Sequence, residues 1–118
     1  MMLVAGNLVY DWIAGPVAAL SWDQTTWPAH FAAGIGGNGA STAIAAASEG
    51  ARVRLITACG ADGHGRTCVD RLVAAGVEVV SLPGLAGETA LTMGIFREDG
   101  ARALLHRPGV LTAAFGET

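Results

Sequence analysis

The sequence contains no lysine, and its seven basic residues other than histidine are all arginine. This absence excludes chemistry that needs a lysine side chain: the phosphate-binding Gly-Lys-Ser/Thr loop, Schiff-base catalysis and lysine-linked cofactors. Charged residues are also scarce, at 14% of the chain, whereas an ordinary domain carries roughly 25%. Two interpretations stay open: part of the surface meets other protein, or the many alanines simply dilute the charged residues.

Long apolar runs and an excess of positive charge are also missing. No stretch approaches the roughly 18 to 20 consecutive apolar residues of a membrane helix, since Gly and polar residues interrupt every run. The first twenty residues include Asp11 and no basic residue, which is unlike a signal peptide. The formal charge is −3, so a basic nucleic-acid-binding surface is not expected. These features predict a cytoplasmic protein without a membrane or nucleic-acid partner.

Cysteine is nearly absent, and histidine is scattered. Cys59 and Cys68 have only His64 between them as a further potential ligand, whereas a closed zinc site needs four ligands at tighter spacing. We therefore predict two ordinary reduced thiols. His30 and His106 lie in other segments, without metal-ligand spacing, so each histidine is expected at the surface or beside a substrate rather than on a metal.

The 118 residues suit one domain, 1–118, with alternating strands and helices. Apolar runs predict strands at residues 1–5, 53–57 and 77–80, and helices at 40–49 and 66–75. Gly50 and Gly76 stand where left-handed residues end helices. Because short loops separate these elements, we expect an α/β layer with a mostly parallel sheet.

The remaining segments are expected to add β structure. Asp99-Gly100 between the apolar runs 89–96 and 101–106 predicts a hairpin. Residues 8–33 are mixed, and short strands are expected only near residues 17–19 and 25–27. A second, smaller β element should therefore accompany the parallel sheet.

Residues 34–39 fit the pattern Gly-x-Gly-x-x-Gly and precede a predicted helix. Unpaired N–H groups at such a turn can bind an anion. A dinucleotide-binding fingerprint should follow a buried strand and be followed by an acidic residue at the end of the next strand. Neither condition is met well, so a tight turn that lets a small-residue helix pack closely is the alternative interpretation.

Several motifs in order fit one known family. They are Gly6 with Asp11 five residues later, residues 36–43 (Gly-Gly-Asn-Gly-Ala-Ser-Thr-Ala) followed by Gly50, residues 60–65 (Gly-Ala-Asp-Gly-His-Gly), residues 88–94 and Arg107-Pro108-Gly109. Together they resemble the N-terminal part of the ribokinase-like (PfkB) carbohydrate kinases. The resemblance implies a parallel sheet flanked by helices with a small β lid, formed by segments near 12–35 and 89–107. It also implies that the C-terminal half of the fold is missing.

The resemblance also implies where a substrate binds. By position, Asp11 would accept hydrogen bonds from two hydroxyls of a sugar or nucleoside, and Gly36 and Gly37 would let the substrate approach the backbone. Asn38 would offer its amide. Ser41 stands where the family usually has Asn; it is shorter and has one polar atom fewer, which bears on substrate choice.

Phosphoryl transfer needs more than these residues supply. The family's catalytic base follows a Gly-Ala-Gly-type turn in the C-terminal half, and no Gly-x-Gly-Asp follows residue 80 here. We therefore expect no catalytic residue and no metal ligand in this chain, with ATP and Mg²⁺ bound mainly by the missing half. Family lids commonly pair, so Trp12, Trp22 and Trp27 are expected to pack in a homodimer.

Two other functions stay open. One is a fragment of a dinucleotide-binding oxidoreductase, and the other is a non-catalytic module for small-molecule binding or dimerisation.

Overall fold

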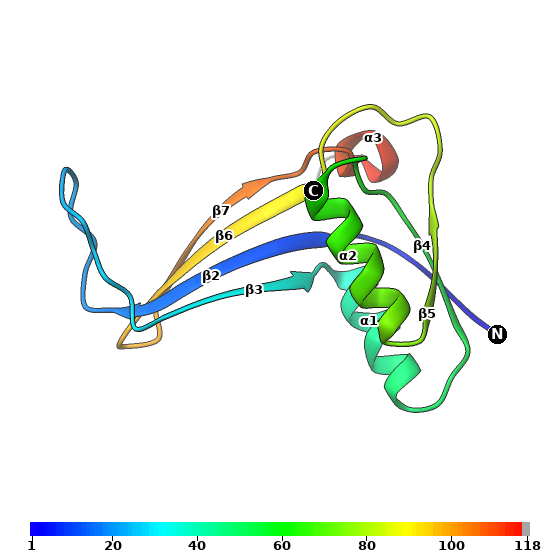
Figure 1. The fold of residues 1–118 in the computed structure, drawn as a ribbon, viewed down its shortest axis with the longest axis horizontal. Helices are drawn as coiled ribbons and strands as arrows, with labels where there is room; N and C mark the ends of the chain where they lie inside the picture. The colour runs from blue at the N-terminus through cyan, green and yellow to red at the C-terminus, as the bar shows by residue number, and fades with distance from the viewer. Residues whose placement is uncertain (117–118) are drawn as a thin grey trace.

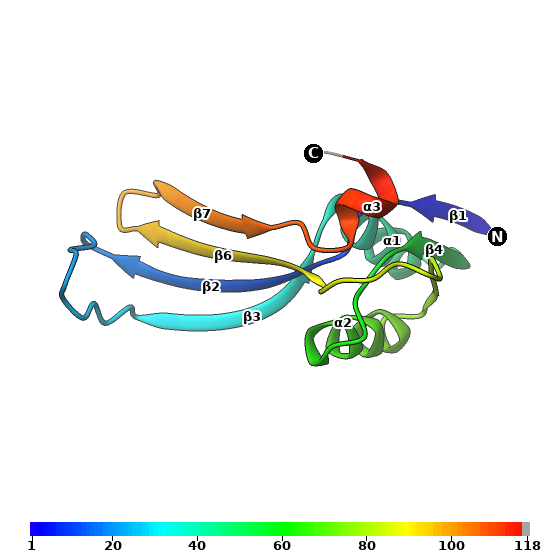
Figure 2. The same ribbon diagram turned by 90° about the horizontal axis from the view of Figure 1, so that it is seen from above.

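A computed structural model describes residues 1–116 as two sheets, joined through helices that pack against one of them (Figures 1 and 2). The strands are β1 (Met2–Ala5), β2 (Val9–Val17), β3 (His30–Gly36), β4 (Val53–Thr57), β5 (Val77–Ser81), β6 (Ala90–Arg97) and β7 (Arg102–Arg107). The helices are α1 (Asn38–Ser48), α2 (Gly63–Ala74) and α3 (Leu111–Phe115). The predicted domain runs to residue 118, so its last residues lie outside the described part.

The first sheet is the predicted parallel layer, with strand order β1-β4-β5. In β4 every second residue is buried, because that strand is central and its alternate side chains face the helical layer, where α1 packs on β4 and α2 on β5. Both helices lie on the face of this sheet from which the second sheet projects (Figure 1). This arrangement confirms the predicted parallel sheet flanked by helices.

The main core lies between that sheet and the two helices. Its buried residues are Leu8, Tyr10, Ala40, Ala43, Val53, Leu55, Cys68, Leu72 and Val77. Alanines on α1 allow the helix to approach the sheet closely, so its small side chains serve packing. Both helices end as predicted, with Gly50 and Gly76 at φ of 94° and 88° directly after their C-terminal turns.

The second sheet, which we call the lid sheet, has the strand order β3-β2-β6-β7. The central strands β2 and β6 run parallel, and the outer strands pair antiparallel to them. Strands β6 and β7 form the hairpin that Asp99-Gly100 predicted, with Gly100 at φ 87°. The sheet extends away from the helices, and its loops lie at the far end from the parallel sheet (Figure 2).

Three predictions of secondary structure need correction: the short strands near 17–19 and 25–27, the segment before the glycine turn, and the start of α2. Residues 18–29 contain no strand, whereas short strands were expected near 17–19 and 25–27; only Val17 lies in one, at the end of β2. Strand β3 (30–36) leads into the glycine turn and includes its residues 34–36, although residues 27–31 had indicated no strand. The first three residues of β3 are exposed and the other four are half-buried. The strand therefore lacks the alternation of apolar and polar residues that would have marked it in the sequence.

Helix α2 begins at Gly63, three residues before the predicted start at 66. The Asp62 side chain caps the helix by accepting a hydrogen bond from the Gly65 N–H at 2.9 Å. No helix within residues 1–116 is long and apolar enough to span a membrane.

Candidate functional site

Asp11 lies on β2 at the base of the lid sheet, directly opposite Gly34 of β3. Gly36 lies two residues after Gly34 in β3 and therefore on the same face of the sheet. The Asp11 carboxylate lies over it, so that a Cβ atom on Gly36 would overlap Asp11 Oδ2. Burial raises the pKa of Asp11, and the charge of His106 partly opposes this effect. The structure thus brings together Asp11 and Gly36, and the lack of a side chain on the glycine makes room for the carboxylate.

Gly37 has a different role in the same turn. Its φ is 90°, and a Cβ atom there would lie 2.5 Å from the carbonyl oxygen of Asn7. Only glycine fits both the backbone conformation and this close approach. The residue stands at the N-cap of α1 without a side-chain hydrogen bond at that end. The Ala40 N–H donates to the Asn7 carbonyl at 3.1 Å, which leaves the N–H groups of Asn38 and Gly39 available to a ligand.

Asn38 and Ser41 lie in the first turn of α1, three residues apart and therefore on one face of the helix. Both are exposed, and neither side chain makes a hydrogen bond within residues 1–116. The backbone N–H of Ser41 donates to the Gly37 carbonyl at 2.9 Å. The two side chains thus stand at the helix end that follows the glycine turn, without a hydrogen bond to Asp11.

Two further residues lie beside Asp11: Thr92, which was not singled out from the sequence, and His106, which was expected at the surface or beside a substrate. Thr92 of β6 pairs with Asp11, and His106 of β7 pairs with Thr92. Thr92 Oγ1 and His106 Nδ1 lie 2.8 Å apart. The predicted hairpin could have placed Thr92 and His106 together, but their position beside Asp11 depends on the parallel pairing of β2 with β6.

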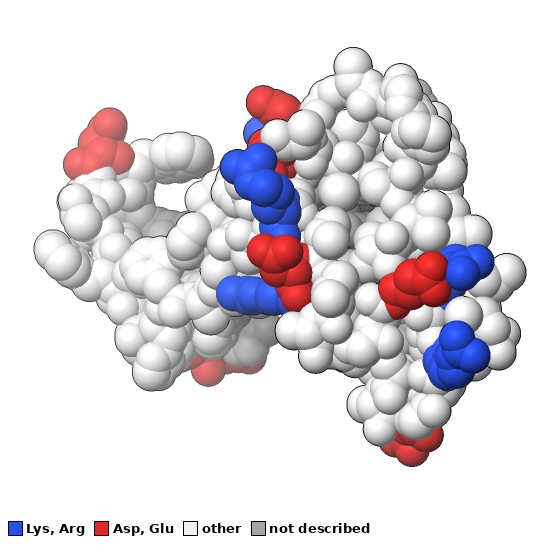
Figure 3. Space-filling model, turned by 45° about the vertical axis from the view of Figure 1, so that its right-hand side comes forward, with Lys and Arg blue, Asp and Glu red and all other residues white. Residues whose placement is uncertain are grey.

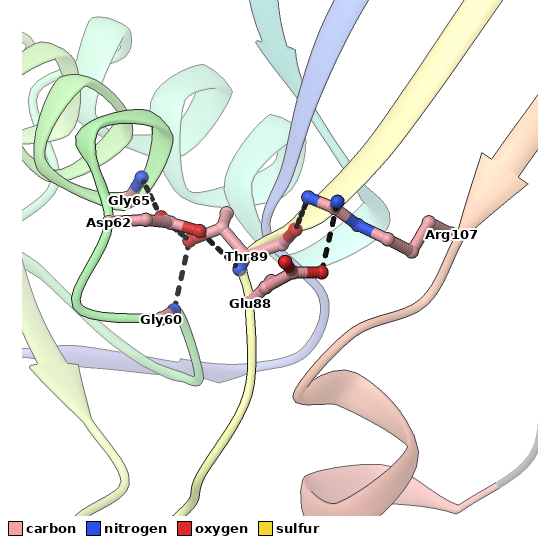
Figure 4. A network of polar contacts seen from close by, with 6 residues as sticks. All are labelled: Gly60, Asp62, Gly65, Glu88, Thr89 and Arg107. Carbon is pink, nitrogen blue, oxygen red and sulfur yellow. Dashed lines mark hydrogen bonds and ion pairs between the residues drawn. The ribbon is translucent and has the colours of Figure 1, made fainter.

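The 60–65 motif forms a polar network that joins α2 to the lid sheet (Figure 4). Asp62 Oδ1 accepts from the Thr89 hydroxyl at 2.6 Å, and Asp62 Oδ2 accepts from the Thr89 N–H at 3.0 Å. The same hydroxyl accepts from the Gly60 N–H at 2.9 Å. Burial by itself raises the pKa of Asp62, but the hydrogen bonds from Thr89 and Gly65 outweigh it and hold the pKa at about 2. The motif therefore holds the end of the lid sheet in place.

A second connection lies at the same, open end of the hairpin. Arg107 donates to the Thr89 carbonyl at 3.1 Å and pairs with Glu88 at 3.0 Å (Figure 4). It thereby ties the end of β7 to the start of β6. The base of the lid sheet, where Asp11 lies, is thus fixed at two points.

The histidines and cysteines do not form a joint site. His64 stacks on Tyr10, with ring centroids 4.5 Å apart, while His30 begins β3. No group of three or more potential metal ligands lies together within residues 1–116. Cys59 and Cys68 are free thiols, as predicted, and burial raises the pKa of Cys68 to about 12, so that thiol is unreactive.

Solved structures with the same architecture include sugar and nucleoside kinases. A ribokinase from Cryptococcus neoformans var. grubii serotype A, in complex with ADP, matches 92% of this chain with 26% identity and a TM-score of 0.73. A ribokinase from Giardia lamblia matches 91% with 20% identity and a TM-score of 0.80. A nucleoside kinase from Burkholderia thailandensis, in complex with inosine, matches 95% with 20% identity and a TM-score of 0.72.

The chain corresponds to only part of these proteins: it covers 33%, 35% and 37% of their lengths. No sequence-family profile and no curated protein sequence matches it. The order of strands and helices nevertheless agrees with the family that the sequence motifs indicated. The chain therefore has the fold of the N-terminal part of the ribokinase-like carbohydrate kinases.

Proposed function

We propose that this chain supplies the substrate-binding part of a kinase that transfers the γ-phosphate of ATP to a hydroxyl of a sugar or nucleoside. The observation that carries the proposal is the placement of Asp11, whose half-buried carboxylate lies beside the glycine turn at the base of the lid sheet. A carboxylate accepts hydrogen bonds only, so it suits a ligand that offers several hydroxyl groups. Asn38 and Ser41 stand at the adjacent end of α1 and would contact the same ligand.

The nucleotide and the metal are assigned to the rest of such a kinase. Phosphoryl transfer requires a base near the accepting hydroxyl, positive charge around the γ-phosphate and a metal ion. Residues 1–116 bring together no group of three potential metal ligands, so no step is assigned to Mg²⁺ on these residues. When bound, the metal would neutralise charge on the phosphates; this chain's own residues would orient the sugar and cover it.

The lid sheet also supports a homodimer. Trp12, Met93 and Leu105 pair across three of its strands, so they form one row on one face. Their exposed fractions are 40%, 48% and 68%. Few charged side chains interrupt the visible face of the lid sheet (Figure 3). An exposed apolar face of this kind is usually covered by protein, and the proposed occupant is the lid sheet of a second copy.

The dinucleotide-binding alternative is weaker. The strand that enters the glycine turn, β3, is the outer antiparallel strand of the lid sheet, whereas a dinucleotide fingerprint follows a buried parallel strand. A non-catalytic binding module would use the same Asp11 site and differ only in lacking phosphoryl transfer. The free thiols support the cytoplasmic location that belongs to this proposal.

Binding and turnover test the proposal separately. NMR titration of the labelled chain with D-ribose and with inosine should give saturable shifts around Asp11 and the glycine turn. Asp11→Ala should weaken binding about 10- to 150-fold, because a hydrogen bond to a charged group contributes roughly 1.5–3 kcal/mol. Asn38→Ala should weaken it less, since its amide is neutral.

The matched control is Asp70→Ala, which removes an exposed carboxylate from α2. Unchanged affinity in Asp11→Ala, or the absence of saturable shifts in the native chain, would contradict the proposal. A coupled assay with ATP and the same ligands should show no turnover by this chain. A rate above about 1 s⁻¹, an ordinary enzyme rate, would show that these residues contain a complete active site.

A further inference from the structure

Four residues form a single row across the base of the lid sheet. The register pairs Gly34 with Asp11, Asp11 with Thr92, and Thr92 with His106, one residue from each strand. Residues directly opposite one another in a sheet point to the same face. The row therefore presents a carboxylate, a hydroxyl and an imidazole side by side, and the space above Gly34 is open, since a Cβ atom there would meet nothing within 4 Å.

The hydroxyl in the middle of the row is held by its neighbour. Thr92 Oγ1 lies 2.8 Å from His106 Nδ1, so a hydrogen bond joins them. A neutral imidazole with its proton on Nε2 uses Nδ1 as an acceptor. In this tautomer the Thr92 O–H donates to His106 Nδ1, and the lone pairs of Thr92 Oγ1 are left to accept from a ligand.

Asp11 and Thr92 would then both accept hydrogen bonds from the same side of the sheet. Neighbouring strands lie about 4.8 Å apart, a span that two hydroxyl groups of one sugar ring can bridge. Two adjacent acceptors favour a neutral ligand with several hydroxyl donors. The large hollow of about 410 Å³ farther out on the lid sheet is lined mainly by apolar side chains such as Trp12, Phe31 and Met93, and has no carboxylate in its lining.

We propose that Thr92 binds a ligand hydroxyl beside the one bound by Asp11, and that His106 is a positioning residue that fixes Thr92 as a hydrogen-bond acceptor. This inference rests on the proposed function and deepens it, because it assigns a second specificity-determining contact to the sugar. A ligand that lacks the matching hydroxyl leaves the Thr92 acceptor unpaired. The Thr92–His106 pair thus selects among sugars that Asp11 alone would accept.

NMR titrations of the full chain with D-ribose, its monodeoxy analogues and inosine test this assignment. Thr92→Val removes the hydroxyl with little change of shape and should weaken ribose binding about 2- to 10-fold, the range for a neutral hydrogen bond. In the same variant, one monodeoxy ribose should bind as tightly as ribose itself. Thr92→Ser keeps the hydroxyl and should retain the native preference.

Variants of His106 separate positioning from a general structural effect. His106→Asn places an acceptor oxygen near the position of Nδ1 and should retain the native preference among the deoxy sugars. His106→Leu removes the acceptor and should reduce that preference to the level of Thr92→Val. The ¹⁵N shifts of the His106 ring in the native chain should show an unprotonated Nδ1.

The outcomes distinguish this inference from the proposed function. If the native chain binds no probe, or if Asp11→Ala binds as well as the native chain, the proposed function fails and this inference fails with it. If Asp11→Ala loses binding while Thr92→Val and His106→Leu keep the native affinities and preferences, only the role of Thr92 and His106 is overturned. A protonated Nδ1 in the native chain would overturn the role of His106 alone.

Discussion

The Thr89 hydroxyl donates a 2.6 Å hydrogen bond to Asp62 Oδ1, joining residues 27 positions apart in the sequence. Asp62 precedes α2, and Thr89 precedes β6, so this contact links the helical layer to the lid sheet. The Thr89 side chain is fully buried. A buried hydroxyl that both donates to a carboxylate and accepts from Gly60 leaves little freedom in how the two parts of the molecule meet.

Removing this carboxylate should destabilise the fold. Asp62→Ala deletes the N-cap of α2 and leaves the Thr89 N–H and hydroxyl without their acceptor. We expect a loss of roughly 2–3 kcal/mol in the free energy of unfolding, from the cap and the unpaired donors together. Asp70→Ala, an exposed position on the same helix, should change it by less than about 0.5 kcal/mol. Urea denaturation followed by circular dichroism measures both, and equal losses in the two variants would contradict the role of Asp62.

The same carboxylate should make stability depend on acid. Its pKa is about 2 in the folded chain, against 3.8 for an ordinary aspartate. Below pH 3.8 the unfolded chain takes up the proton first, so the stabilisation by Asp62 is complete above that pH and is lost as the pH falls toward 2. Asp99 also has a lowered pKa and adds to the loss of stability in acid. The contribution of Asp62 is therefore the difference between the native chain and a variant that lacks the Asp62 carboxylate.

Thermal melts of the native chain and of Asp62→Asn between pH 2 and 6 isolate this contribution. The native chain should lose more of its melting temperature in that window than the variant. Parallel curves for the two proteins would show that Asp62 has an ordinary pKa in the folded chain.

Gly37 and Gly36, the two glycines of the turn, should respond differently to alanine: Gly37 through stability and Gly36 through ligand binding. Gly37→Ala meets the Asn7 backbone and forces an L side chain to φ 90°, which should cost about 1–3 kcal/mol of stability. Gly50→Ala has a similar φ of 94° but open space around it, so it serves as the control for backbone strain without a clash. We expect Gly37→Ala to lower the urea midpoint more than Gly50→Ala does.

Gly36→Ala should instead affect ligand binding. Its new methyl group meets the Asp11 carboxylate, which is the end of a side chain and can rotate away. The free energy of unfolding should therefore change little, while ribose binding weakens about as much as in Asp11→Ala. A variant that unfolds easily but binds normally when folded would contradict this assignment.

The apolar row on the lid sheet should control self-association. Met93→Glu places a charge in the middle of the row, between Trp12 and Leu105, and burying that charge in an interface is costly. The dimer dissociation constant should rise about tenfold or more. Val73→Glu adds the same charge at a position on α2 that is 59% exposed, and should leave it unchanged. Light scattering across a concentration series measures both; an unchanged dimer in Met93→Glu, or a native chain that stays monomeric, would contradict the proposed dimer.

Local patterns were sufficient for much of the fold. Strands β4 and β5, helices α1 and α2, and the glycines that end these helices follow from apolar spacing and from the left-handed conformation that glycine permits, which are properties of short segments. The Asp99-Gly100 pair predicted the hairpin for the same reason. The motifs around Gly36, Asp62 and Pro108 indicated the family, because their order along the chain is itself sequence information.

Only the tertiary structure decided which residues meet. The first three residues of β3 are exposed and the other four are half-buried, so its side chains do not alternate between buried and exposed and its sequence did not mark it as a strand. Its hydrogen bonds to β2 define it. Asp11, Thr92 and His106 lie in three segments, and the pairing of β2 with β6 places them side by side. Such pairings depend on the packing of the whole sheet, since a shift of one residue would turn each side chain to the other face.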